Sequence, residues 1–171
     1  MSLVYLGVGS NIDREYHIQL ALDILAKAFG ELTVSSIYQS EAVGFVGDDF
    51  YNLVVLIETE LSVATLFKFL RDIEYRYGRP IEASKNSGRT IDLDILSYDD
   101  FVGYFDGVQL PRAEILFNAF VLRPLEEIAS HLKHPEDGRT YGELWQAFDK
   151  KAQRLHIVRF SGQSSMTKTL V

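Results

Sequence analysis

Two aspartates separated by a single residue are the first candidates for chemistry in this chain. Asp92 and Asp94 alternate with Ile91, Leu93 and Ile95, which is the period of a strand that is buried on one side. On the open face their Cα atoms would lie roughly 6.5 to 7 Å apart, close enough for both carboxylates to share a hard cation. Two ionised carboxylates at that separation repel each other unless a cation or a shared proton lies between them.

A fixed positive charge comes just before this pair. Arg89 precedes Asp92 by three residues, so the segment would place a cation site and a guanidinium side by side. That combination is suited to holding a polyphosphate with bound magnesium. The competing interpretation is the ordinary solvated face of an amphipathic strand, although Asp is a poor strand former. The local pattern leaves both interpretations open.

The composition is typical of an ordinary soluble globular protein. The chain has 171 residues, of which 47% are hydrophobic and 24% charged, and it has no cysteine. We expect a single catalytic domain over residues 1–160 and a flexible tail over residues 161–171. The formal charge of −7 argues against a nucleic-acid partner. No apolar run reaches membrane-spanning length and no signal-like segment opens the chain, so we expect a cytoplasmic protein that has no membrane partner.

Hydrophobic periodicity predicts alternating strands and helices. The segments that carry it are strand 3–8, helix 12–29, strand 32–38, strand 50–58, helix 62–77 and strand 90–97. This order, βαββαβ, predicts an α+β fold with a ferredoxin-like antiparallel sheet and helices packed on it. The C-terminal additions would be helices at 116–128 and 141–148 and a late strand at 155–160.

Four blocks of the sequence resemble the 6-hydroxymethyl-7,8-dihydropterin pyrophosphokinase family. They are residues 5–11 (Tyr-Leu-Gly-Val-Gly-Ser-Asn), 35–52, 74–95 and 110–125, in family order and with near-family spacing. The most specific is Gly-Arg-Thr-Ile-Asp-Leu-Asp-Ile, residues 88–95. The resemblance implies a ferredoxin-like fold and an enzyme of folate biosynthesis. Such an enzyme moves pyrophosphate from ATP to a pterin alcohol and releases AMP.

The resemblance also implies roles on the nucleotide side. Asp92 and Asp94 would bind two Mg²⁺ ions that bridge the ATP phosphates, during in-line attack of the pterin hydroxyl on the β-phosphorus. Arg79 and Arg89 would assist the transfer as catalytic arginines. The nucleotide contacts would come from Glu74, Arg89, Ile95 and Arg112. For Glu74 an alternative is an exposed helical carboxylate paired with a neighbouring arginine.

On the pterin side, the resemblance implies a flat slot. Phe50 and Phe120 fall at the two stacking positions, and Asn52 falls at the asparagine that reads the ring through its amide. Ser40 and Val43 match the flanking contacts. Taken singly, both phenylalanines would be interpreted as core residues.

The departures from the family pattern lie mostly on the ATP side. They are Ile81, Asn86, Gly107, Gln109, Ala113 and Asn118, together with Glu41 and Ala42 in the segment before the third strand. Each lost charged contact to a phosphate is worth roughly 1.5 to 3 kcal/mol. Arg112 could restore one such contact.

Three hypotheses follow from this sequence. The first is a working pterin pyrophosphokinase whose nucleotide site has drifted. The second is a diverged paralogue that acts on another pterin or phosphate donor, and the third is a non-catalytic pterin-binding protein. The loops 39–49 and 81–88 are candidates for lids that exclude water under the first hypothesis. The sequence does not indicate an oligomeric state.

Overall fold

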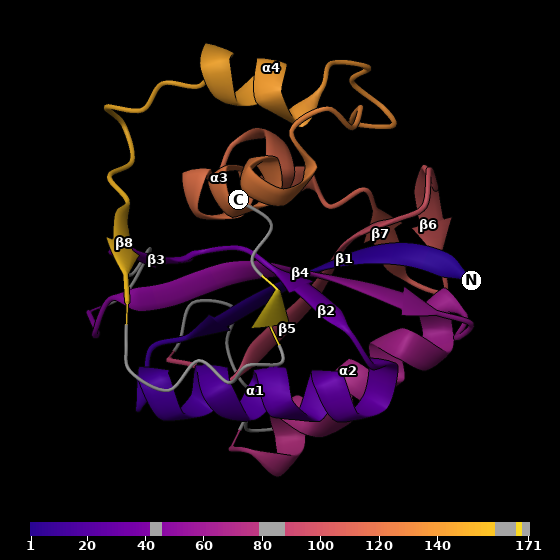
Figure 1. Cartoon of the computed structure of the whole chain (residues 1–171), viewed down its shortest axis with the longest axis vertical. Coiled ribbons are helices and arrows are strands. Elements are labelled where there is room, and N and C mark those ends of the chain that lie inside the picture. The colour runs from indigo at the N-terminus through magenta and orange to yellow at the C-terminus, as the bar shows by residue number, and fades with distance from the viewer. Residues whose placement is uncertain (42–45, 79–87, 160–166, 169–171) are drawn as a thin grey trace.

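A central, mostly antiparallel sheet lies between two layers of helices in the computed structural model (Figure 1). The structure describes residues 1–41, 46–78, 88–159 and 167–168. The strands of the central sheet are β1 (Ser2–Ser10), β2 (Leu32–Val34), β3 (Ile37–Ser40), β4 (Phe50–Thr59), β5 (Asp92–Tyr98), β8 (His156–Val158) and β9 (Thr167–Lys168). The helices are α1 (Arg14–Phe29), α2 (Val63–Arg76), α3 (Ala119–Ala129) and α4 (Tyr141–Ala147), with a 3₁₀ turn η1 at Ala113–Leu116.

The predicted α+β class is confirmed, and the strand order is the one expected for βαββαβ connectivity. β1 lies between β5, at one edge of the sheet, and β4, and it is antiparallel to both; β4 in turn pairs with both β2 and β3. The helices α1 and α2 cover one face of the sheet, and α3 and α4 cover the other (Figure 1).

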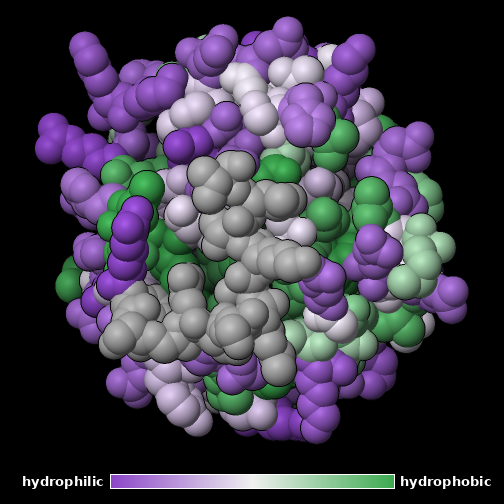
Figure 2. Space-filling model, in the orientation of Figure 1, coloured by the Kyte–Doolittle hydropathy of each residue, from purple (hydrophilic) through white to green (hydrophobic). Residues whose placement is uncertain are grey.

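Alternation along the strands divides the core between these two faces. Val4, Leu6 and Val8 of β1 lie in the cluster beneath α1 and α2, whereas Tyr5 belongs to the smaller cluster with α3 and α4. In Figure 2 hydrophilic residues cover the outer helices, and hydrophobic residues show mainly in the middle band of the molecule. No described helix combines the length and the apolar character that a membrane crossing requires.

The predicted strand over 32–38 is wrong in one respect, because the structure divides it. Ser35 interrupts the pairing: its Oγ accepts the buried N–H of Val54 at 2.9 Å and donates to the carbonyl of Ser36 at 2.8 Å. A side chain that replaces a ladder partner ends one strand and lets the next begin at a new register. The chain resumes as β3, so Gln39 and Ser40 belong to a strand and not to the predicted loop.

Other boundaries differ more modestly. The first helix begins at Arg14 rather than at residue 12, and the predicted helix 116–128 starts only at Ala119, after the 3₁₀ turn. A hairpin of β6 (Gly103–Phe105) and β7 (Val108–Leu110) was not predicted. Within the segment predicted as a tail, residues 161–171, β9 pairs in parallel with β2, and residues 161–166 and 169–171 lie outside the described part of the chain.

Candidate active site

The register of the sheet places two of the predicted site residues, Asp92 and Asn52, in one line across four strands. On β1, Gly9 lies opposite Asp92 of β5 and also opposite Asn52 of β4, and Asn52 in turn lies opposite Tyr38 of β3. We call these four residues the cross-strand row. Because neighbouring strands are about 4.8 Å apart, Asp92 and Asn52 lie roughly 10 Å from each other. Two residues along, Gly7 lies opposite Asp94.

The glycines of β1 contribute no side chains of their own between the carboxylates and the amide, so side chains of the neighbouring strands lie over them: that of Asn52 over Gly9 and that of Leu96 over Gly7. A Cβ on Gly9 would lie 2.7 Å from Oδ1 of Asn52, so no other residue fits there unless the Asn52 amide moves. The Nδ2 of Asn52 donates to Oγ of Ser40 at 3.4 Å. The Gly-Val-Gly sequence therefore lies within a strand and makes room for the Asn52 side chain.

The two aspartates lie on this face as predicted, on the face opposite the one through which Leu93 and Ile95 enter the core. Nη1 of Arg112 lies 3.4 Å from Oδ1 of Asp94, whose side chain is 21% exposed, and Nε of Arg112 lies 3.1 Å from Glu114. The backbone N–H of Arg112 donates to the carbonyl of Leu96 at 2.7 Å, which fixes this arginine at the edge of β5.

Burial and mutual repulsion make the carboxylate pair hard to ionise. Burial raises the pKa of Asp92 to about 7, and the charges of Asp94 and Glu74 add to the effect, while Arg89 and Arg112 oppose it. The pKa of Asp94 is raised as well, first by burial and then by Glu74, against the lowering effect of Arg112. A divalent cation would remove this repulsion.

The donor set fits magnesium. Mg²⁺ is commonly held by one or two carboxylates and completes its shell with phosphate and water oxygens. Among the described residues no group of three or more His, Cys, Asp or Glu side chains could enclose a metal ion by itself. A site built on Asp92 and Asp94 would therefore complete the metal's shell with phosphate or water oxygens.

Glu74 lies beneath the pair and not on the open face. Its side chain is fully buried, one oxygen accepts the N–H of Leu93 at 2.8 Å, and the other lies 2.5 Å from Nη1 of Arg71. The alternative of an exposed helical carboxylate is therefore wrong about exposure, although the pairing with a neighbouring arginine is present. Leu93 lies between the two aspartates in the sequence. Its hydrogen bond to Glu74 therefore fixes the backbone of β5 at the point from which both carboxylates project.

Arg89 is held by an asparagine that sequence reasoning did not select. The N–H of Arg89 donates to Oδ1 of Asn11 at 2.7 Å, and the N–H of Asn11 donates to the carbonyl of Arg89 at 3.0 Å. The Nδ2 of Asn11 donates to the carbonyl of Asp48 at 3.3 Å. Asn11 lies two residues after Gly9 in the sequence. This closeness to the glycines was the one sequence feature that could have identified Asn11 as a site residue.

The predicted pterin residues come from three elements. Ser40 and Phe50 face each other at the ends of β3 and β4, and Asn52 follows two residues along β4 on the same side. Phe120 lies in the first turn of α3, which packs over β3 and β4. Ile95, predicted to contact the nucleotide, is only 3% exposed and lies in the core, so any such contact would come from its main chain.

Several predicted residues lie outside the described part of the chain. They are Ala42, Val43, Arg79, Ile81 and Asn86, together with residues 42–45 of the first predicted lid and 81–87 of the second. Their roles remain sequence predictions.

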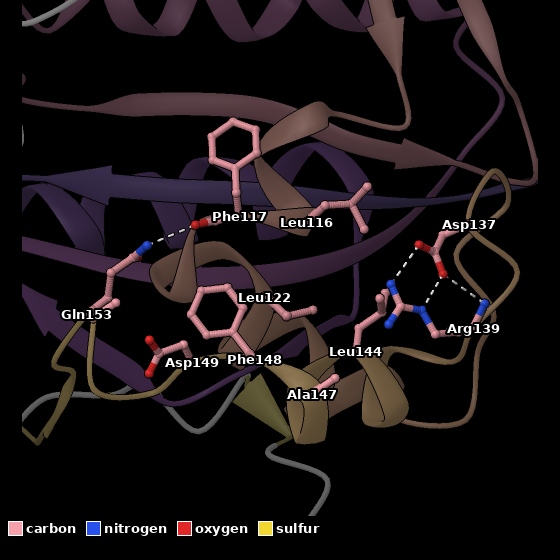
Figure 3. Close-up of a pocket in the computed structure, with 11 residues that line it drawn as sticks. Leu116, Phe117, Leu122, Asp137, Arg139, Leu144, Ala147, Phe148, Asp149 and Gln153 are labelled. Carbon is pink, nitrogen blue, oxygen red and sulfur yellow. Dashed lines mark hydrogen bonds and ion pairs between the residues drawn. The ribbon is translucent and has the colours of Figure 1, made fainter.

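A separate cavity of about 420 Å³ lies between α3, α4 and the segment that follows α4, and none of the predicted site residues lines it (Figure 3). Its polar side chains are engaged with one another or with the main chain. Gln153 donates to the carbonyl of Phe117 and accepts the N–H of Ala119, each at 2.8 Å. Asn118, the residue before α3, makes no side-chain cap, so Gln153 satisfies the start of the helix that carries Phe120.

The raised pKa of Asp92 predicts a pH-dependent gain in stability for Asp92→Asn in metal-free protein. With the folded pKa above the unfolded value of 3.8, the folded state loses stability as pH rises from about 4 to about 7. Asn carries no such charge, so at pH 8 in EDTA the variant should be more stable by roughly 1–3 kcal/mol, or several degrees in Tm. The difference should vanish near pH 4. Thermal melts at pH 4.5, 6 and 8 measure it.

The matched control for this prediction is Asp100→Asn, a change at an exposed turn. It should leave Tm within a degree or so of wild type at every pH, as expected for an isolated surface change. An Asp92→Asn variant that is equally destabilised at pH 4.5 and pH 8 would contradict the electrostatic explanation.

Comparison with known proteins identifies the family of this chain. The sequence model of the 7,8-dihydro-6-hydroxymethylpterin-pyrophosphokinase family matches residues 5–130. The 2-amino-4-hydroxy-6-hydroxymethyldihydropteridine pyrophosphokinase of Aquifex aeolicus is 34% identical over 137 residues, which cover 79% of this chain and 85% of that protein. The bifunctional protein FolKE of Lactococcus lactis subsp. lactis is 33% identical over 167 residues, or 93% of this chain and 46% of that protein.

The fold is similar to that of solved structures with HPPK in their names. A crystal structure of Plasmodium falciparum HPPK-DHPS superposes with a TM-score of 0.66 at 15% identity, over 85% of this chain and 43% of that one. The chain thus spans less than half the length of this structure and of the Lactococcus relative. The match over residues 5–130 and the Aquifex relative establish the family: the chain belongs to the 7,8-dihydro-6-hydroxymethylpterin-pyrophosphokinases.

Proposed function

We propose that this protein transfers pyrophosphate from ATP to 6-hydroxymethyl-7,8-dihydropterin and releases AMP, a step of folate biosynthesis. The observation that carries the proposal is the cross-strand row, in which a carboxylate suited to magnesium and an amide suited to a pterin lie on the same face of the sheet, one on each side of Gly9. The separation of roughly 10 Å suits a substrate whose ring lies at one end and whose reacting hydroxyl lies at the other.

On the pterin side, the described residues offer stacking and hydrogen bonds. Phe120 from α3 and Phe50 from β4 would form the two walls of a slot for a flat ring, and stacking adds roughly 0.5–1.5 kcal/mol to the burial of each aromatic pair. The amide of Asn52 presents both a donor and an acceptor to the ring edge. Ser40 supports that amide from β3.

On the phosphate side, Asp92 and Asp94 would hold two Mg²⁺ ions, which would neutralise charge on the attacking and leaving oxygens. Arg89 and Arg112 supply positive charge near the pair, and both lower the pKa of Asp92 against the effect of burial. Glu74 acts through β5, because it holds the N–H of Leu93 between the two carboxylates.

The transfer itself exchanges one P–O bond for another. The hydroxymethyl oxygen of the pterin forms a bond to the β-phosphorus, and the bond from that phosphorus to the oxygen of the α-phosphate breaks. AMP leaves with the electron pair, and Asp94 would receive the hydroxyl proton. The residues contribute mainly orientation and charge stabilisation, which account for most of the rate acceleration in transfers of this kind.

The assignment of Asp92 and Asp94 predicts a split between binding and turnover. Asp92→Ala and Asp94→Ala should each lower AMP release by roughly 100-fold or more, the usual scale for removing charge stabilisation from a transition state. Pterin affinity should stay nearly intact, because the aspartates lie two strand spacings from Asn52. AMP formation from ATP and Mg²⁺, with and without the pterin, measures the first effect, and calorimetry measures the second.

Asp100→Ala serves as the control in both assays. A double variant at Asp92 and Asp94 that still transfers pyrophosphate would refute the metal assignment. Wild-type protein that binds the pterin but forms no AMP would instead favour a diverged paralogue or a pterin-binding protein.

The close approach of Gly9 to Asn52 predicts that Gly9→Ala weakens pterin binding. The new methyl group would displace the Asn52 amide, and loss of its hydrogen bonds should raise the pterin Kd by roughly tenfold or more. The same change made together with Asn52→Ala should add little, because both act through one amide. Additive losses in the double variant would show that Gly9 acts in another way.

A further inference from the structure

Helix α3 is fastened to the sheet by one glutamate. Oε1 of Glu127 accepts both the N–H and the hydroxyl of Ser36, each at 2.9 Å, and Oε2 accepts the hydroxyl of Tyr38 at 2.6 Å. Three hydrogen bonds to one carboxylate are a strong and directional attachment, because hydrogen bonds to a charged acceptor are stronger than those between neutral groups. We call Glu127, Ser36 and Tyr38 the α3 anchor.

The anchor connects directly to the cross-strand row. Tyr38 is the last member of that row and lies opposite Asn52, with 3% of its surface exposed. Burial raises the pKa of Tyr38, and the hydrogen bond to Glu127 raises it further, so the hydroxyl keeps its proton as a donor at any physiological pH.

The direction of the helix relative to β3 follows from a second contact. Glu127 meets Ser36 and Tyr38, and Arg123, one turn earlier on α3, lies with its Cζ 5.9 Å from the centre of the Tyr38 ring. The direction from Glu127 to the start of α3 is therefore the same as the direction from Ser36 to Ser40 along β3. Phe120 and Glu127 are seven residues apart and share one face of α3.

These positions give the anchor a role in the slot. Ser40 lies roughly 6.6 Å beyond Tyr38 along β3, and Phe120 lies roughly 10.5 Å before Glu127 along α3. Phe120 is therefore carried toward the end of β3 and β4 where Ser40 and Phe50 pair. The separation between Phe120 on α3 and Phe50 on the sheet therefore depends on the α3 anchor, which joins the helix to β3.

We infer that Glu127 is a positioning residue that sets the width of the pterin slot through its hydrogen bonds to Ser36 and Tyr38. The inference rests on the proposed function and names a determinant of ring binding within it. A flat ring needs both walls in contact with its faces, so an error of a fraction of an ångström in the placement of α3 weakens stacking on both sides. The phosphate side, which depends on β5 and Arg112, is untouched.

The test compares variants of the full chain by steady-state kinetics and by direct pterin binding. Glu127→Ala should raise the pterin KM and Kd by roughly tenfold or more while the ATP KM changes less than about twofold. Glu127→Gln, which keeps the size and one acceptor, should recover part of the loss. Tyr38→Phe, which removes one bond and keeps the ring, should cost roughly threefold and should add little to Glu127→Ala.

Two controls separate positioning from loss of stability. Glu126→Ala removes the neighbouring glutamate, which pairs with Arg123 instead of the sheet, and should leave the pterin KM within about twofold of wild type. Leu144→Ala empties part of the core behind α3 and should lower Tm with little change in the pterin KM.

The inference is overturned if Glu127→Ala raises both KM values equally, or if it lowers Tm as Leu144→Ala does and leaves pterin affinity unchanged. Failure of the proposed function gives a different pattern. In that case the wild type itself forms no AMP with the pterin, and if it still binds the pterin, the Kd series alone decides the role of Glu127.

Discussion

Everything in the candidate site depends on the pairing register of β1 with its two neighbours. One strand aligns Asp92 on one side and Asn52 on the other with Gly9 between them. A slip by one residue would turn these side chains into the core and bring Leu93 and Leu53 onto the open face. The register is protected because Leu6 and Val8 of β1 are buried on the opposite face, so the hydrophobic core and the site are specified by the same alternation.

The carboxylate pair opposes folding and is held in place by its surroundings. Burial and repulsion raise the pKa values of both aspartates, and the structure supplies partial compensation from Arg112 at 3.4 Å and from the charge of Arg89. Glu74 adds further negative charge and yet fixes the strand between the aspartates. A site of this kind is poised for a cation, because the cation removes a cost that the apo protein carries.

Much of this arrangement was predictable from the sequence, for identifiable reasons. Period-two alternation at residues 91–95 was enough to place Asp92 and Asp94 on one face, and the order of strands and helices was enough for the antiparallel sheet. The break at Ser35 was not predictable, because it depends on a serine hydroxyl capturing the N–H of a residue nineteen positions away. The burial of Glu74 was missed for a similar reason, since a charged helical residue is ordinarily exposed and only β5 supplies its partner.

Some residues that position the site could not be predicted from the sequence, because they act through contacts between distant elements. Gln153 completes the start of α3, and Glu127 ties the same helix to β3, across 34 and 91 residues of sequence respectively. Neither residue belongs to a recognisable motif, so pattern and propensity do not select them. Such contacts become visible only when the fold has brought the segments together.

The most direct test of the proposed site is a crystal structure with Mg²⁺, 6-hydroxymethyl-7,8-dihydropterin and α,β-methylene-ATP, which cannot be cleaved at the reacting bond. We expect metal density bridging Asp92, Asp94 and the phosphates, with the pterin ring between Phe50 and Phe120 and its edge on Asn52. A pterin bound elsewhere, or phosphates that reach neither aspartate, would contradict the proposal.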